Sequence, residues 1–99
     1  MIRIMVLYPR GEGTHFNNNY WLNTHMPMLN NKWPKLKKWE ADIAGSDSPY
    51  YAVAHIYFDS MDDMQATMAS PGTGEVLGDI PNYTNTSPII STNTVSASS

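Results

Sequence analysis

Two runs of the chain are strand-like and apolar on both faces, and this limits the folds that 99 residues can adopt. Residues 2–8 alternate Ile, Ile, Val and Tyr with Arg, Met and Leu, and residues 50–59 are apolar or aromatic at most positions. Strands of this kind suit a sheet that is covered on both sides. We therefore predict two covering layers, with residues 50–59 as a central strand.

Two weaker runs complete the predicted sheet. Residues 36–44 alternate apolar and charged side chains with a period of two, which indicates a strand with one solvent-exposed face or a strand at the edge of the sheet. Residues 87–96 form a polar, Thr-rich strand that we place at an edge, and residues 96–99 are expected to fray. Residues 45–49 read as a loop because four of their residue types favour turns.

Helical segments separate these strands. The first is expected over residues 16–30, with Thr14 or Asn17 as its N-cap. Its apolar stripe is Leu22, Met26 and Leu29, spaced at i, i+4 and i+7.

A second helix is expected to begin at the N-cap Ser60 and to stop at residues 70–72, followed by a short helical segment over residues 73–80. The order β-α-β-β-α-β is that of a ferredoxin-like α+β fold, an antiparallel four-stranded sheet with its helices on one face. We treat residues 1–99 as one domain.

Pro27 interrupts the first helix, because a proline inside a helix removes a backbone donor and costs about 3 kcal/mol. Either the helix starts late, or it kinks or ends near Met26. We predict a kink or a loosened turn beside His25, which would leave carbonyl groups free near the imidazole.

Composition narrows the classes of partner. The formal charge of −3 argues against a nucleic-acid backbone and against anionic membranes. No cysteine is present, which excludes disulfides and thiolate chemistry, and no stretch approaches about 20 apolar residues. We expect a soluble cytoplasmic protein. Three Trp, six Tyr and seven Met in so short a chain predict an oligomer or a ligand cavity.

Segments along nearly the whole chain, from about residue 2 to residue 95, resemble the EthD family, which is named after a protein of ethyl tert-butyl ether degradation. The segments that carry the resemblance are Tyr8-Pro9, Phe16, Tyr20-Trp21, Thr24-His25-Met26-Pro27, Val53-Ala54-His55, Phe58-Asp59-Ser60 and residues 79–84. The resemblance implies a dimeric α+β barrel, a homodimer in which two sheets face each other. Relatives in this superfamily include cofactor-free monooxygenases, cyclases and dehydratases, so the fold does not fix one reaction.

His25 is the strongest candidate for catalysis, because an imidazole at the rim of an apolar cavity titrates near neutrality and can exchange a proton with a bound carbonyl or enol. The family motif matches at this position. The alternative is a structural histidine that bonds a carbonyl freed by Pro27.

A second group of candidates lies on the loop before the last strand, where Asp79, Asn82 and Tyr83 can fold over a cavity mouth. Asp79 is a candidate to orient His25. The alternative is that Asp79 and Asn82 satisfy backbone groups of the turn.

Aromatic side chains are candidates for lining a pocket. We expect Tyr20, Trp21, Tyr51 and Tyr57 to contact a ligand, with His55 facing the barrel interior beside Tyr51 and Tyr57. The alternative is that these side chains belong to the hydrophobic core or to the dimer interface.

Metal and nucleotide sites are not expected. His15, His25 and His55 share no short ligand spacing, and Gly11-Glu12-Gly13 lacks the remaining glycine of a phosphate-binding loop.

These observations give two hypotheses of different class. The first is a homodimeric EthD-like protein that binds a hydrophobic, oxygenated small molecule and transfers protons without a cofactor, as a cyclase, dehydratase or monooxygenase would, with His25 as acid or base. The second is a non-catalytic accessory or ligand-binding protein of a degradation pathway. A third possibility is a structural partner of a larger oxygenase.

Overall fold

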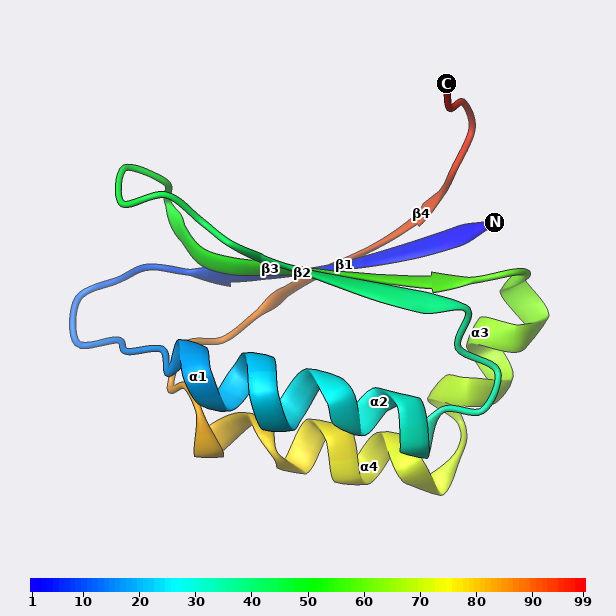
Figure 1. Cartoon of the computed structure of the whole chain (residues 1–99), viewed down its shortest axis with the longest axis horizontal. Coiled ribbons are helices and arrows are strands. Elements are labelled where there is room, and N and C mark those ends of the chain that lie inside the picture. The colour runs from blue at the N-terminus through cyan, green and yellow to red at the C-terminus, as the bar shows by residue number, and fades with distance from the viewer.

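The computed structural model describes residues 1–99 as two layers, a four-stranded antiparallel sheet and a layer of helices on one of its faces (Figure 1). The strands are β1 (Ile2–Pro9), β2 (Lys38–Ile43), β3 (Tyr50–Phe58) and β4 (Ile89–Thr94). Their order across the sheet is β2-β3-β1-β4. This confirms the ferredoxin-like prediction, with the two strands that are apolar on both faces at the centre and the two weaker strands at the edges.

The first helical unit is continuous and contains one irregular turn. It runs from α1 (Asn18–Tyr20) through a π-helical turn, η1 (Trp21–His25), into α2 (Met26–Lys32). Asn17 is the N-cap, since its side chain accepts a hydrogen bond from the backbone N–H of Tyr20 at 3.1 Å. The predicted loosened turn beside His25 is confirmed, and the helix continues past Pro27 instead of ending there.

The second helical unit comprises α3 (Met61–Met68), α4 (Pro71–Gly78) and a 3₁₀ turn, η2 (Ile80–Asn82). Ser60 caps α3 as predicted, and its hydroxyl accepts from the backbone N–H of Asp63 at 3.1 Å. Pro71 is the first residue of α4, a position whose backbone N–H has no partner within the helix, so proline is tolerated there. The helix therefore starts two residues earlier than predicted. None of the helices has both the length and the apolar composition of a transmembrane span.

The core lies between the sheet and the helices. Alternate residues of β1 and β3 face the helices and are nearly inaccessible: Ile2, Ile4, Tyr8, Ala52, Ala54, Ile56 and Phe58. The opposite face of the sheet carries no covering element, as the edge-on view shows (Figure 1). The half-buried side chains of Met5, Leu7 and Val53 belong to that face.

Candidate functional site

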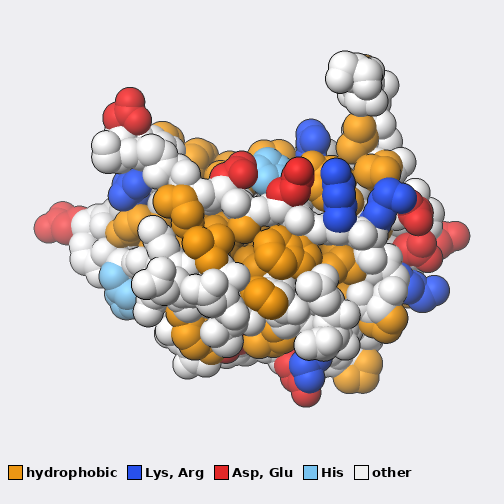
Figure 2. Space-filling model, in the orientation of Figure 1, with side chains coloured by type: hydrophobic (Ala, Val, Ile, Leu, Met, Phe, Trp, Pro, Cys, Tyr) orange, Lys and Arg blue, Asp and Glu red, His pale blue; other side chains and the backbone are white.

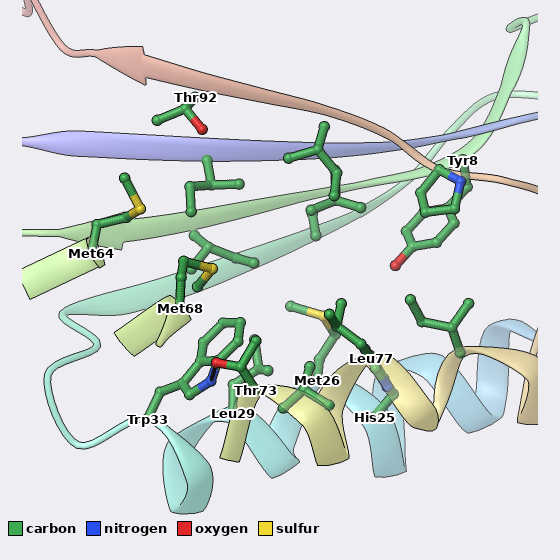
Figure 3. A pocket seen from close by; sticks show the side chains of 18 residues that line it. Tyr8, His25, Met26, Leu29, Trp33, Met64, Met68, Thr73, Leu77 and Thr92 are labelled. Carbon is green, nitrogen blue, oxygen red and sulfur yellow. Dashed lines mark hydrogen bonds between the residues drawn. The ribbon is translucent and has the colours of Figure 1, made fainter. Parts of the chain in front are cut away.

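A cavity of about 200 Å³ lies between the sheet and the helices (Figure 3). Most of its lining is aliphatic or thioether side chains, drawn from β1, β3 and β4 above and from the helices below. The lining residues are Ile4, Val6, Tyr8, His25, Met26, Leu29, Trp33, Ala54, Ile56, Met64, Met68, Thr73, Val76, Leu77, Ile80, Pro88, Ile90 and Thr92. A dry, largely apolar cavity of ~150 Å³ can hold benzene, so this one has room for a ring with a short substituent.

The exposed lining residues mark the mouth of the cavity. Met68, Leu77 and Ile90 are 37%, 52% and 58% exposed, although they line the same space as buried core residues. They belong to α3, α4 and the edge strand β4. The cavity therefore opens between β4 and the second helical unit.

Few polar groups face this space, and they differ in what they can offer a ligand. The hydroxyl of Thr73 is already occupied, since it accepts from the indole N–H of Trp33 at 3.0 Å and donates to the carbonyl of Thr67 at 2.6 Å. Thr92 is exposed at the mouth. Tyr8 and His25 are the remaining buried polar lining residues, so they define the polar end of the cavity.

The π-helical turn sets the position of His25. The backbone N–H of Met26 bonds to the carbonyl of Trp21, five residues back, which adds one residue to the turn. As a result, Trp21, His25, Met26 and Leu29 are all at most 4% exposed. In the predicted stripe, Met26 and Leu29 are buried, and Leu22 is partly buried and packs against the core.

His25 and Asp79 are brought together from elements 54 residues apart in the chain. His25 Nδ1 lies 2.9 Å from Asp79 Oδ2, and both residues are buried. The other carboxylate oxygen accepts from the Tyr20 hydroxyl at 2.7 Å and from the Asn82 amide at 2.9 Å. Each carboxylate oxygen thus has a donor, which fixes the carboxylate against the imidazole.

Two tyrosines continue the network on the other side of the imidazole. The Tyr83 hydroxyl is 3.3 Å from His25 Nε2, and it is 2.7 Å from the hydroxyl of Tyr8. The rings of His25 and Tyr83 also pack together, with centroids 4.5 Å apart. The ring of His25 therefore bonds a carboxylate and a phenol, and no carbonyl freed by Pro27.

Burial and hydrogen bonding determine the charges of this network. Burial lowers the pKa of His25 below its ordinary 6.5, although the carboxylate of Asp79 opposes that shift. Burial alone would raise the pKa of Asp79, but the hydrogen bonds to its carboxylate outweigh burial and hold the pKa below 3.8. Burial raises the pKa of Tyr8 and of Tyr83. At neutral pH the network is a neutral imidazole, a carboxylate and two neutral phenols.

The seven residues expected to bind a ligand all lie outside the lining of this cavity. Tyr20 and Asn82 contact the far side of Asp79, and Tyr83 contacts His25 from behind the lining. Trp21 is fully buried in an aromatic cluster with Tyr8 and Phe16, and its indole N–H has no hydrogen-bond partner.

The other three expected ligand-binding residues lie farther away. The Tyr51 hydroxyl donates to the carbonyl of Thr14 at 2.9 Å. His55 and Tyr57 point to the uncovered face of the sheet, where they bond Asp42 and Glu40, each at 2.8 Å. Successive residues of a strand point to opposite faces, so His55 and Tyr57 lie on the face of the sheet away from His25. Tyr51, at the start of β3, stacks on Phe16 with ring centroids 5.7 Å apart.

Tyr8 is the cavity residue that sequence reasoning missed as a site residue. The available signal was a hydroxyl at the end of a strand face that is otherwise Ile, Ile and Val. A buried Tyr usually finds a partner for its O–H, so such a position predicts a polar neighbour from another element. No group of three or more His, Asp or Glu side chains is arranged to hold a metal ion.

Comparison with solved structures defines the class of fold. A dimeric protein of ferredoxin-like fold from Bacteroides fragilis matches with a TM-score of 0.67 at 14% identity, over 93% of each chain. SnoaB, a cofactor-independent oxygenase from Streptomyces nogalater, matches with a TM-score of 0.70 at 10% identity, over 98% of this chain and 93% of that one. At these identities the likeness establishes the fold alone.

Two further matches establish the family. The EthD domain model matches residues 16–87. An EthD-like protein from Ralstonia eutropha JMP134 is 30% identical, with a TM-score of 0.83 over 97% of this chain and 92% of that one. The chain therefore belongs to the EthD family. Comparison with curated protein sequences gave no match.

Proposed function

We propose that this protein binds a small, largely apolar, oxygenated molecule in the cavity between sheet and helices, and that His25 exchanges a proton with it. The observation that carries the proposal is a neutral, buried imidazole at the polar end of an apolar cavity, bonded to a buried carboxylate at 2.9 Å. Asp79 would hold the imidazole in one tautomer and stabilise the imidazolium that forms.

The chemistry of the site supports proton transfer without a cofactor. A base is most effective when it is neutral at the working pH, and the lowered pKa of His25 meets that condition. The apolar lining strengthens electrostatic interactions by excluding water. The fold is shared with a cofactor-independent oxygenase, which is consistent with such chemistry but does not assign it.

We also propose that the protein is a homodimer in which the uncovered faces of two sheets meet. Neighbours of the same fold from Bacteroides fragilis and Thermobifida fusca are described as dimeric. The uncovered face carries apolar side chains and the buried Arg3 Nε, which has no hydrogen-bond partner within the chain. In such a dimer His55 and Tyr57 face the second copy, whereas His25 lines the cavity between the sheet and the helices of its own chain.

The experiment begins with mass spectrometry of the purified protein, which identifies any small molecule retained in the cavity. The exchange of the acidic hydrogens of that molecule with D₂O is then followed by NMR. We expect His25→Ala to lower the exchange rate by about 10²- to 10⁴-fold while the affinity changes little. His15→Ala, which removes an exposed imidazole, is the matched control and should leave the rate unchanged.

The alternative function is a non-catalytic binder in a degradation pathway. It predicts the same cavity ligand, no exchange above the rate in buffer, and an equal loss of binding in His25→Ala. That result would remove the catalytic part of the proposal and keep the binding part.

A further inference from the structure

The hydroxyls of Tyr8 and Tyr83 form a hydrogen-bonded path from His25 Nε2 to a second point on the cavity wall, and the proposed function leaves this path unused. Tyr83 is 1% exposed and lies outside the cavity lining, whereas Tyr8 lines the cavity. Figure 3 shows the hydroxyl of Tyr8 directed from the sheet toward the helices, into the space between them. The order of the four groups is therefore Asp79, His25, Tyr83, Tyr8. His25 and Tyr8 both line the cavity, but both ring nitrogens of His25 are already bonded, so Tyr8 is the member of the path that can meet a ligand.

The position of each hydrogen along this path follows from its neighbours. An ionised carboxylate only accepts, so the hydrogen shared by Asp79 and His25 belongs to Nδ1. The other nitrogen of a neutral imidazole is then an acceptor, and it takes the hydrogen of Tyr83. The oxygen of Tyr83 accepts the hydrogen of Tyr8 in turn, at 2.7 Å. The single hydroxyl hydrogen of Tyr8 is therefore donated to Tyr83 and is not free to bond a ligand.

We infer that Tyr8 meets a ligand as an acceptor, and that the cavity selects molecules that present a hydroxyl group, such as a phenol or an enol, over molecules that offer only an acceptor. This inference rests on the proposed ligand cavity. A carbonyl or ether oxygen at the same place would need the hydrogens of both tyrosines to reverse. His25 Nε2 would then be buried without a donor, which disfavours that arrangement.

The same path gives a balanced proton transfer. The ligand O–H bond breaks and its proton passes to Tyr8 Oη, the proton of Tyr8 passes to Tyr83 Oη, and the proton of Tyr83 passes to His25 Nε2. The net change is one ligand hydroxyl converted to an oxyanion and one imidazole converted to an imidazolium beside Asp79. Both tyrosines end neutral, as their burial requires. The 3.3 Å link between Tyr83 and His25 is the longest step and must shorten for transfer.

The test uses 4-alkylphenols, from 4-methylphenol to 4-pentylphenol, each paired with its methyl ether. Titration calorimetry gives the two dissociation constants of each pair. We expect the best-fitting phenol to bind about tenfold more tightly than its ether, the effect of one buried hydrogen bond. In Tyr8→Phe the acceptor is gone, so the ratio should fall to about one. Tyr50→Phe removes the same atom from the start of β3, outside the network, and should keep the wild-type ratio.

Tyr83→Phe separates a role in the path from a structural role. This variant removes the acceptor of the Tyr8 hydrogen, which then becomes free to bond a ligand. Methyl ethers should therefore gain affinity until they bind about as well as the phenols, although Tyr83 does not line the cavity. Circular dichroism of each variant establishes that it is folded, and a simple loss of packing would weaken phenols and ethers alike.

The outcomes distinguish this inference from the function on which it rests. Equal affinities in the wild type, tighter binding of the ethers, or an unchanged ratio in either variant overturns the inference and leaves a ligand cavity. Failure of every phenol and every ether to bind removes the cavity ligand, and with it both proposals.

Discussion

At the scale of single residues, His25 is unusual because it is buried beside a carboxylate and is still a weaker base than a free histidine. The loss of hydration outweighs the attraction of Asp79. The side chains that hydrogen-bond to its ring are Asp79 and Tyr83, and no Lys or Arg forms an ion pair with either of them. The protonation of this one side chain therefore affects the stability of the whole fold.

We predict that the protein loses stability as the pH falls below about 6.5. Above that pH, His25 is neutral in both the folded and the unfolded chain. Below it, the unfolded chain binds the proton first because the folded pKa is lower, so the unfolding free energy decreases by up to about 1.4 kcal/mol per pH unit until the folded pKa is passed. Asp79 adds a second loss below about pH 3.8, since its folded pKa is also lowered. Urea unfolding between pH 8 and 4 measures the first effect.

The control for this prediction is His15→Gln, at an exposed position. It should reproduce the wild-type dependence on pH, whereas His25→Gln should flatten it between pH 6.5 and the folded pKa. An increase in stability on acidification in this window would contradict the assignment of a lowered pKa.

At the scale of the elements, the close approach of α4 to α2 depends on one glycine. A Cβ atom added to Gly72 would lie 2.6 Å from the backbone oxygen of Lys32 and 3.2 Å from its Cβ. Both helices contribute lining residues, among them Met26, Leu29 and Val76. The spacing of the two helices thus shapes the floor of the cavity.

We predict that Gly72→Ala lowers the unfolding free energy by about 1–3 kcal/mol, because the backbone oxygen of Lys32 cannot move without shifting α2. Gly74→Ala is the matched control in the same helix, where an added Cβ meets no atom within 4 Å. It should raise the unfolding free energy by about 0.4–1 kcal/mol, since alanine lowers the entropy of the unfolded chain. Urea denaturation measures both, and equal effects of the two variants would contradict the close contact.

At the scale of the whole molecule, one face of the sheet is covered by helices and the other is open, although both are partly apolar. On the side seen in Figure 2, acidic and basic side chains lie along the upper part of the molecule, above a belt of apolar ones. On the open face itself, β2 carries one base, Lys38, and two acids, Glu40 and Asp42. Leu7 of β1 pairs there with Val53 and Ile89. A face with charges of both signs around an apolar centre suits a second copy of itself.

We predict that sedimentation at micromolar concentration gives twice the chain mass of 11.1 kDa. Leu7→Glu should shift the species to a single chain, because it buries an unpaired carboxylate at the centre of the proposed interface. The control is Met61→Glu on α3, which is 40% exposed and away from that face, and it should remain dimeric. A wild-type monomer under these conditions would refute the barrel.

Much of the fold was determined by local patterns that the sequence shows directly. Alternation with a period of two separates the two faces of each strand whatever the rest of the chain does, and Ser60 caps α3 through backbone groups three residues away. Pro27 disturbs the helix at His25 because it lacks an N–H group, which is a property of the residue itself. These features depend on neighbours in sequence, so they could be predicted.

The composition of the site was decided by tertiary structure. Periodicity groups His55 with Tyr57 on one face of β3 but does not state which face the helices cover, and that choice places both residues away from His25. The contacts of Tyr8 with Tyr83 and of His25 with Asp79 join residues 75 and 54 positions apart. Such pairs depend on the crossing of helices over the sheet and on a one-residue shift in the π-helical turn, and no local pattern specifies them.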